Sequence, residues 1–263
     1  MISDKDSIAK RVYTHVSAVL NEAKKRNAFY LINKETDENI FNFGLEKANA
    51  KQYWEELYQK AKINMIMHAQ FQGELIEVAA NHPLINGQPS PEFQARLDYA
   101  ALLYKRLKDQ DKIIKIYVPG SLHMANGIID ECSLSQAGKE YLIKKGIDSE
   151  NIMGDEMNIK YKGEDGVYNS SDECFVATQI FNDYSFCRLH TICSQNQAIR
   201  KQLFYIAFGV IPFVHTTSCD VLAHDFIYEL FEATTNIIYN DHTWQDKDSP
   251  DGNRTRNERK PQN

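Results

Sequence analysis

The stretch "KIIKIYVPGS", residues 112–121, decides the fold class of this chain. Its first seven residues are rich in β-branched and apolar side chains, which predicts a strand over 112–118. A Pro-Gly pair then ends the apolar run, and Ser121 and His123 follow it. Two interpretations are open for this loop. It is either a tight turn or the place where a strand opens into a ligand-binding loop.

Strands and helices alternate on both sides of this stretch. Short apolar runs predict further strands at 63–69, 151–153, 186–193 and 210–217. Helical spacing of apolar residues and helix-capping signals predict helices at 6–25, 46–62, 91–108, 133–146, 170–181, 196–208 and 221–240. Strands separated by helices require right-handed crossovers and a parallel sheet that is covered on both faces. The predicted fold class is therefore α/β, a three-layer sandwich with a mainly parallel, Rossmann-like sheet and N-terminal helices.

Capping signals set several of these helix boundaries. Ser90 is the expected N-cap of one helix, with proline as its first residue. Ser133 and Gln136 have the spacing of a capping box, as do Ser170 and Glu173. Residues 159–169 are polar and contain glycine, which indicates an insertion between a strand and a helix.

Three regions follow from this pattern. Residues 1–62 are expected to be an N-terminal helical segment packed on the core, and residues 63–240 the α/β domain. Residues 241–263 are polar and have too little apolar surface to offset the entropy of ordering, which predicts a disordered tail.

Composition excludes several classes of protein. The chain of 263 residues is 43% hydrophobic, 25% charged and carries a net charge of −6, which argues against nucleic acid as a partner. It has 5 cysteines and no C-x-x-C pair, so we expect free thiols and no structural zinc site. It contains neither an apolar run long enough for a membrane span nor a signal peptide, which predicts a soluble, cytoplasmic protein.

Ligands of parallel α/β sheets bind beyond the carboxyl ends of the strands, so the polar residues there are the candidate site. Glycine permits close backbone approach, helix N-termini receive anions, carboxylates accept from ribose hydroxyls, and arginine holds an anionic group. The candidates that these arguments supply are Gly120, Ser121, Asp155, Glu156, Ser171, Glu173, Ser194, Gln197 and Arg200.

The order of these motifs resembles the YdcF-like family, which includes SanA and ElyC. The similar segments are "RLDYAALLYK", "VPGS", "SQAGKEYLIKKGI", "ENIMGDE", "NSSDEC" and "CSQNQAIRKQLFYIAFGV", within about residues 90–215. Arg96, Ser171, Glu173 and Arg200 occupy positions that the family pattern uses. The resemblance adds Ser135 and Gln136 to the candidate ligand contacts.

The resemblance implies a Rossmann-like protein that binds a small nucleotide-like ligand. One YdcF-like protein is associated with S-adenosylmethionine, so S-adenosylmethionine or a nucleotide is the implied ligand, with no metal predicted. Gln136 and Gln197 stand where the family has an acid and a histidine, and Cys174 replaces an asparagine. Two titratable groups are thus missing, which weakens any acid–base mechanism borrowed from the family.

Two other functions remain open. The chain could be a hydrolase or transferase acting on phosphate or diphosphate esters, assisted by a metal held by Asp155, Glu156 and Glu173. It could instead be a non-catalytic interaction protein with a degenerate site. In that case Trp54 and Tyr58 of the N-terminal segment should be exposed.

Overall fold

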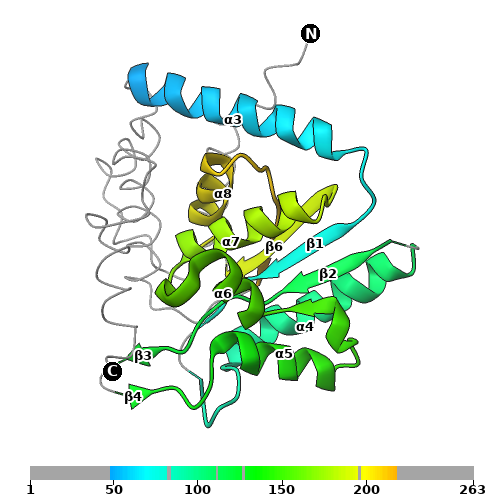
Figure 1. Ribbon diagram of the computed structural model, residues 1–263, viewed down its shortest axis with the longest axis vertical. Coiled ribbons are helices and arrows are strands. Elements are labelled where there is room, and N and C mark those ends of the chain that lie inside the picture. Colours follow the sequence, from blue (N-terminus) through cyan, green and yellow to red (C-terminus); the bar gives the residue numbers. More distant parts are fainter. Residues whose placement is uncertain (1–47, 82–83, 111, 126–127, 195–196, 218–263) are drawn as a thin grey trace, which may run out of the picture.

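The computed structural model describes residues 48–81, 84–110, 112–125, 128–194 and 197–217 (Figure 1). Five parallel strands form one sheet, with the spatial order β5-β2-β1-β6-β7. In chain order they are β1 (Glu74–Val78), β2 (Ile114–Tyr117), β5 (Ile152–Met153), β6 (Arg188–Ser194) and β7 (Phe213–Thr217).

Helices cover both faces of this sheet. One face packs against α4 (Pro91–Lys108) and α5 (Leu134–Lys144), and its core includes Ile76 and Ile116. The other face packs against α7 (Ser170–Asp183) and α8 (Ala198–Ala207), and its core includes Leu75 and Tyr117. Consecutive residues of β1 and β2 therefore point to opposite faces, as a buried parallel strand requires.

The connections give the sheet its Rossmann-like character. From the central strand β1 the chain moves outward through β2 to β5, and it then returns to the other side of β1 for β6 and β7. Helices α4 and α5 make the first set of crossovers, and α7 and α8 make the second. The predicted α/β class and parallel, Rossmann-like sheet are confirmed.

The first strand predicted from the sequence is wrong. Residues 63–69, expected as a strand, belong to the end of α3 (Ala48–His68) and the turn after it. The predicted boundary between residues 62 and 63 thus falls inside a continuous helix. The true central strand is β1, whose sequence "ELIEV" has two glutamates that hide its apolar pattern.

Two of the three predicted caps are confirmed. Ser90 accepts a hydrogen bond from the Phe93 N–H at the start of α4, and Ser133 accepts one from the Gln136 N–H at the start of α5. The third prediction is wrong by one residue. Asn169 is the N-cap of α7, because its side chain accepts from the Asp172 N–H, and Ser170 is already helical.

Residues 159–169 are not a plain polar insertion. The first of them complete α6 (Asp155–Lys162), which is followed by the 3₁₀ turn η4 (Gly163–Asp165). Another 3₁₀ turn, η3 (Ser149–Asn151), precedes β5, and the loop after β2 holds a small hairpin of β3 (Met124–Ala125) and β4 (Ile128–Ile129).

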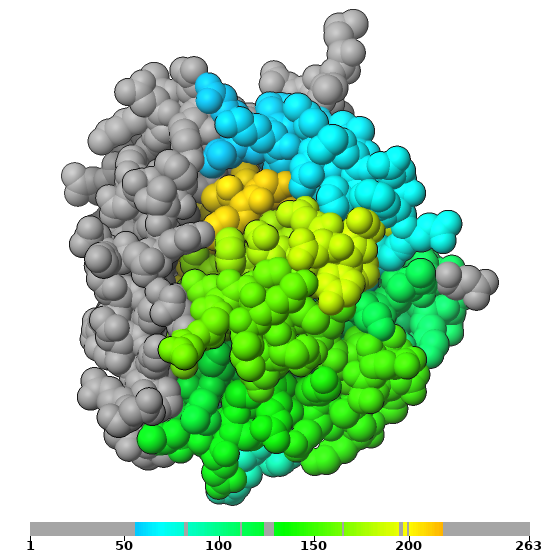
Figure 2. Space-filling model, viewed as in Figure 1, coloured from blue at the N-terminus to red at the C-terminus, as the bar shows by residue number. Residues whose placement is uncertain are grey.

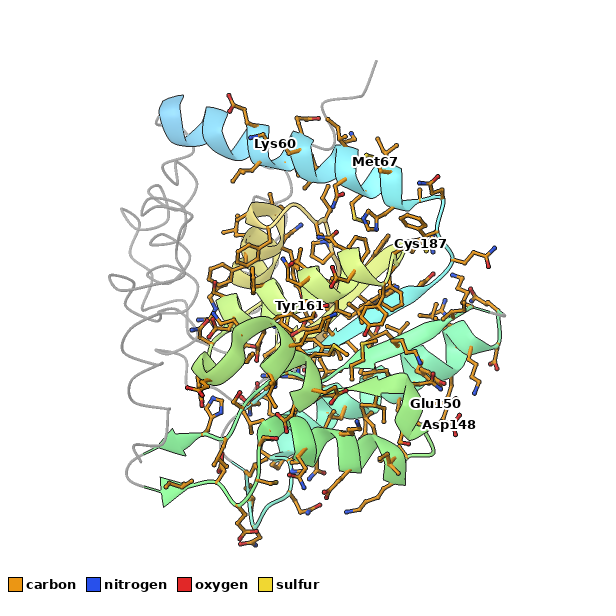
Figure 3. The ribbon with its side chains drawn as sticks, in the orientation of Figure 1. Lys60, Met67, Asp148, Glu150, Tyr161 and Cys187 are labelled. Carbon is orange, nitrogen blue, oxygen red and sulfur yellow. The ribbon has the colours of Figure 1, made fainter. Side chains whose placement is uncertain are left out.

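Helix α3 packs against α8 at one end of the molecule (Figures 1 and 2). Side chains fill the space between the layers, while Met67 on α3 is 56% exposed (Figure 3). The predicted helices at 6–25 and 221–240 and the tail at 241–263 lie outside the described residues. Among the helices that are described, none has the length and apolar character needed to cross a membrane.

Candidate functional site

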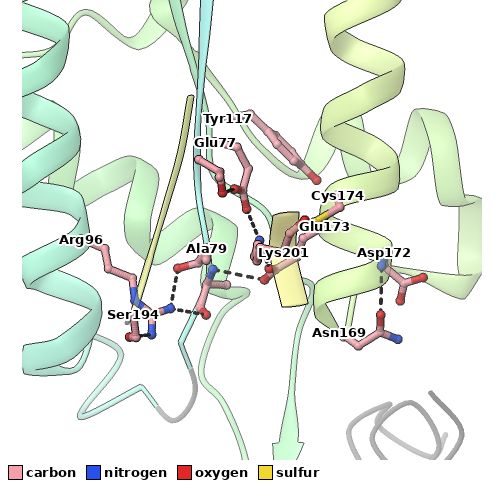
Figure 4. A network of polar contacts seen from close by, with 12 residues as sticks. Glu77, Ala79, Arg96, Tyr117, Asn169, Asp172, Glu173, Cys174, Ser194 and Lys201 are labelled. Carbon is pink, nitrogen blue, oxygen red and sulfur yellow. Dashed lines mark hydrogen bonds and ion pairs between the residues drawn. The ribbon is translucent and has the colours of Figure 1, made fainter. Parts of the chain in front are cut away.

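The strand order reverses between β1 and β6, and this point is where ligands of doubly wound sheets bind. Residues Ala79 and Ala80 directly follow β1 there, and Ser194 ends β6. We call the residues around these two strand ends the switch-point edge. Side chains from both helical layers converge on it (Figure 4).

On the α4 side, Arg96 holds the end of β1. Its guanidinium is fully buried and donates from Nη1 to the carbonyl oxygens of Ala79 and Ala80, both at 2.9 Å. Its Nη2 donates to Glu92 Oε1 and to Ser194 Oγ, both at 2.5 Å. Ser194 in turn donates to the same Glu92 oxygen. One arginine therefore ties the ends of β1 and β6 to each other and to the first turn of α4.

On the opposite face, a buried cluster of Glu77, Lys201 and Glu173 holds the same segment. Lys201 Nζ lies 2.5 Å from Glu77 Oε1 and 2.5 Å from Glu173 Oε2. The other oxygen of Glu173 accepts the Ala80 N–H at 3.1 Å, and Glu77 also accepts from Thr191 on β6. The peptide after β1 is thus held by Arg96 from one layer and by Glu173 from the other.

The charged groups of this cluster are buried and compensate one another. Burial raises the pKa of Glu77 despite the neighbouring Lys201. Burial alone would lower the pKa of Lys201, but the carboxylates of Glu173 and Glu77 raise it above its ordinary value. Because the ammonium is fully buried and keeps its proton, Lys201 acts as a fixed charge and not as a proton donor.

The loop after β2 packs tightly against the switch-point edge. Gly120 has a φ of +102°, and a Cβ there would lie 2.8 Å from Leu134 Cβ and 3.0 Å from Ala80 Cβ. Ser121 binds Val167, donating from its N–H and accepting the Val167 N–H at Oγ, both at 2.9 Å. His123 Nδ1 lies 2.7 Å from the carbonyl oxygen of Ser121. Gly120 and Ser121 therefore have structural contacts in this loop, and a ligand contact there remains a prediction.

The polar groups at the ends of β2 and β5 are engaged with one another. Asp155 accepts from Ser133 Oγ at 2.5 Å, and Glu156 accepts the Gly154 N–H at 2.8 Å, so both carboxylates lie at the start of α6. Ser135 is 1% exposed and donates its N–H to the Gly120 carbonyl. Its Oγ has no hydrogen-bond partner in the described part of the chain.

The remaining candidates differ in their placement. Gln136 is exposed and donates to Glu140 on the outer surface of α5. Ser171 and Arg200 are buried, at 4% and 7% exposed, so Arg200 is no surface ion-pair residue. Gln197 precedes α8 as its N-cap.

Hydrogen bonds and close contacts join only part of the predicted set. They connect Ser135, Gly120, Glu173 and Ser194 through Ala80 and Arg96 along the carboxyl edge of the sheet. Sequence reasoning missed Glu77, Glu92 and Lys201. A charged residue near the end of a strand was the available signal for Glu77, whereas Lys201 follows Arg200 in a helix and looks like a surface residue.

The contacts give no support to the metal-assisted alternative. Asp155, Glu156 and Glu173 bind different partners, a serine hydroxyl, a backbone N–H and a lysine. Within the described ranges, no three His, Cys, Asp or Glu residues are grouped as a metal ion would need. The interaction-protein alternative expected Tyr58 to be exposed, and Tyr58 is 3% exposed. The side chain of Trp54 lies outside the described part.

Comparisons with protein-family models, with curated proteins and with solved structures find no match for this chain.

Proposed function

We propose that this chain binds a small nucleotide-like ligand, S-adenosylmethionine or a nucleotide, at the switch-point edge. The observation that carries the proposal is the convergence of buried polar side chains from α4, α7 and α8 on the peptide that follows β1. Such an arrangement fixes the strand ends that a ligand would contact, and a fixed site loses less entropy on binding. The resemblance to the YdcF-like family supports the same ligand class.

Glu92 has a carboxylate oxygen at the switch-point edge that could accept a hydrogen bond from a ligand. Its side chain is 20% exposed, and its Oε1 is used by Arg96 and Ser194. Its Oε2 accepts no hydrogen bond from the residues that the structure describes. A ribose offers two adjacent hydroxyl donors, so the ribose of the ligand is the group we assign to Glu92.

The two cations that hold the switch-point edge, Arg96 and Lys201, already have carboxylate partners. Arg96 is bound to two carbonyls, Glu92 and Ser194, and Lys201 is enclosed by two carboxylates. A phosphate chain would therefore approach a carboxylate and find both of these cations neutralised. S-adenosylmethionine, which has a ribose and no phosphate, is for this reason the first ligand to test.

Isothermal titration with S-adenosylmethionine, adenosine and ATP, each at up to millimolar concentration, tests the proposal. A Glu92→Gln variant keeps the shape of the side chain and should weaken ribose binding roughly 10-fold or more, the value of a hydrogen bond to a charged group. Glu140→Gln on the outer face of α5 is the matched control. The proposal fails if no ligand produces heat and the thermal midpoint of the wild-type protein does not change.

A further inference from the structure

Four side chains outside the switch-point edge form one hydrogen-bonded chain. Glu74 Oε2 lies 2.7 Å from His190 Nε2, and His190 Nδ1 lies 3.0 Å from His215 Nε2. His215 Nδ1 lies 3.2 Å from the hydroxyl of Tyr99. The chain thus runs from β1 through β6 and β7 to α4, on the face of the sheet that α4 covers.

The series of hydrogen bonds from Glu74 to Tyr99 has two protonation states in which every imidazole nitrogen has a hydrogen-bond partner. Glu74 is ionised, because hydrogen bonds from His190 and Lys112 outweigh burial and lower its pKa to about 2, so His190 Nε2 must carry a hydrogen. With both imidazoles neutral, His190 Nδ1 accepts from His215 Nε2–H, and His215 Nδ1 accepts from the Tyr99 hydroxyl. Every nitrogen then has a partner.

One added proton gives the second state. The proton binds His215 Nδ1, which then donates to the Tyr99 oxygen while the tyrosine hydrogen turns away. The Nε2–H bond of His215 breaks as an Nδ1–H bond forms on His190, so His190 becomes the imidazolium beside Glu74. His215 ends neutral, with its hydrogen on the other nitrogen, and all three hydrogen bonds of the chain survive.

A second added proton cannot bind without the loss of one of these hydrogen bonds. It would put hydrogens on both His190 Nδ1 and His215 Nε2, which face each other at 3.0 Å. Burial and the neighbouring His190 lower the pKa of His215 to about 4, which agrees with this geometry. The two rings belong to adjacent strands, β6 and β7, so a second proton breaks the hydrogen bond between these two side chains.

Among the described residues, the charged and titratable groups beside this hydrogen-bonded chain lie at its Glu74 end, where Cys187 also interacts with the carboxylate. Lys112 Nζ lies 2.5 Å from Glu74, and Arg188 on β6 lies 3.4 Å from the same carboxylate. Tyr99 is the contact from α4, and Phe213 of β7 covers His190 with ring centroids 5.3 Å apart. Both cations contact Glu74 and oppose a positive charge on His190, whereas the Glu74 carboxylate favours it through a direct contact of 2.7 Å that His215 lacks. We assign the first proton to the His190 end because of this contact.

We propose that Glu74, His190, His215 and Tyr99 form a one-proton relay, in which the first proton reverses the imidazole hydrogen bonds and a second proton breaks the hydrogen bond between the two rings. The relay is a pH-sensitive device at the sheet edge. It does not depend on ligand binding at the switch-point edge.

Nitrogen-15 spectra of the histidine rings across a pH titration test the relay, because they report which ring nitrogen carries hydrogen. We expect both rings to hold hydrogen on Nε2 alone at high pH. As His190 becomes an imidazolium, His215 should change to the Nδ1–H tautomer and stay neutral. The relay is overturned if His215 keeps its Nε2 hydrogen during that step, or if His215 is the first to become charged.

A Tyr99→Phe variant adds a second test with a small structural change. The tyrosine hydroxyl donates to His215 Nδ1 before the first proton binds and accepts from Nδ1–H afterwards, so its loss removes one hydrogen bond from each state. The midpoint of the first protonation should therefore stay within roughly 0.5 unit of the wild-type value. Tyr141→Phe is the control, since that hydroxyl binds Asp98 away from the chain. A midpoint that changes by more than about 1 unit in Tyr99→Phe and not in Tyr141→Phe contradicts the relay.

Discussion

Replacing Lys201 by methionine should strongly destabilise the fold. Methionine fills most of the lysine volume but leaves Glu77 and Glu173, which Lys201 now contacts at 2.5 Å each, without their cation. Breaking a buried ion pair in this way costs about 3–5 kcal/mol, a large part of the ~5–15 kcal/mol that stabilises an ordinary domain. Urea denaturation at pH 7 measures the loss, and Lys144→Met on the exposed side of α5 is the matched control.

The pH dependence of the variant identifies the cause of the loss. Burial already raises the pKa of Glu77, and without the Lys201 cation nothing offsets it, so the folded variant binds a proton more readily than the unfolded chain. Its stability should therefore recover as the pH falls from 7 towards 5. Glu77→Gln combined with Lys201→Met removes one of the two stranded charges and should be more stable than Lys201→Met alone. A loss below about 1 kcal/mol, or one that acid does not relieve, would refute the argument.

Three further predictions concern other parts of the sheet. Gly120→Ala should destabilise more than Gly209→Ala, because both positions have a positive φ but only Gly120 has close neighbours; equal thermal midpoints would contradict this. Iodoacetamide should alkylate Cys187 before Cys193, since Cys193 is buried and burial raises its pKa to about 12; mass spectrometry of timed samples checks the order. Glu74 has its pKa lowered from 4.5 to about 2, so its contribution is present above pH 4.5 and is lost towards pH 2. A Glu74→Gln variant should lack that part of the acid-induced loss in a denaturation series.

The sequence predicted the strands that consist mainly of apolar and β-branched residues. Runs such as 112–118 and 210–217 are apolar and rich in β-branched residues, and both contain real strands. The central strand was missed because "ELIEV" has Glu74 and Glu77 at buried positions, where only tertiary partners make a carboxylate tolerable. The run at 63–69 was assigned in its place, since a short apolar segment does not distinguish a strand from the end of a helix.

The candidate site was predicted in outline and not in its contacts. The rule that ligands bind beyond the strand ends selected Glu173 and Ser194, and both lie at the switch-point edge. It also selected Asp155 and Glu156, whose oxygens are used at the start of α6. Whether a carboxylate is open or engaged depends on partners from distant segments, and local sequence does not report them.

The arrangement around β1 explains why charged residues occupy the centre of this fold. A peptide that follows a parallel strand has free N–H and C=O groups, and at half-buried Ala80 both groups have side-chain partners. Arg96 supplies donors from one layer and Glu173 supplies an acceptor from the other. Each of these charges then needs a counter-charge, which Glu92 and Lys201 provide. Glu92 has the most exposed side chain of these four groups, at 20%, and no described residue donates to its Oε2, so a ligand can be recognised there without opening the buried cluster.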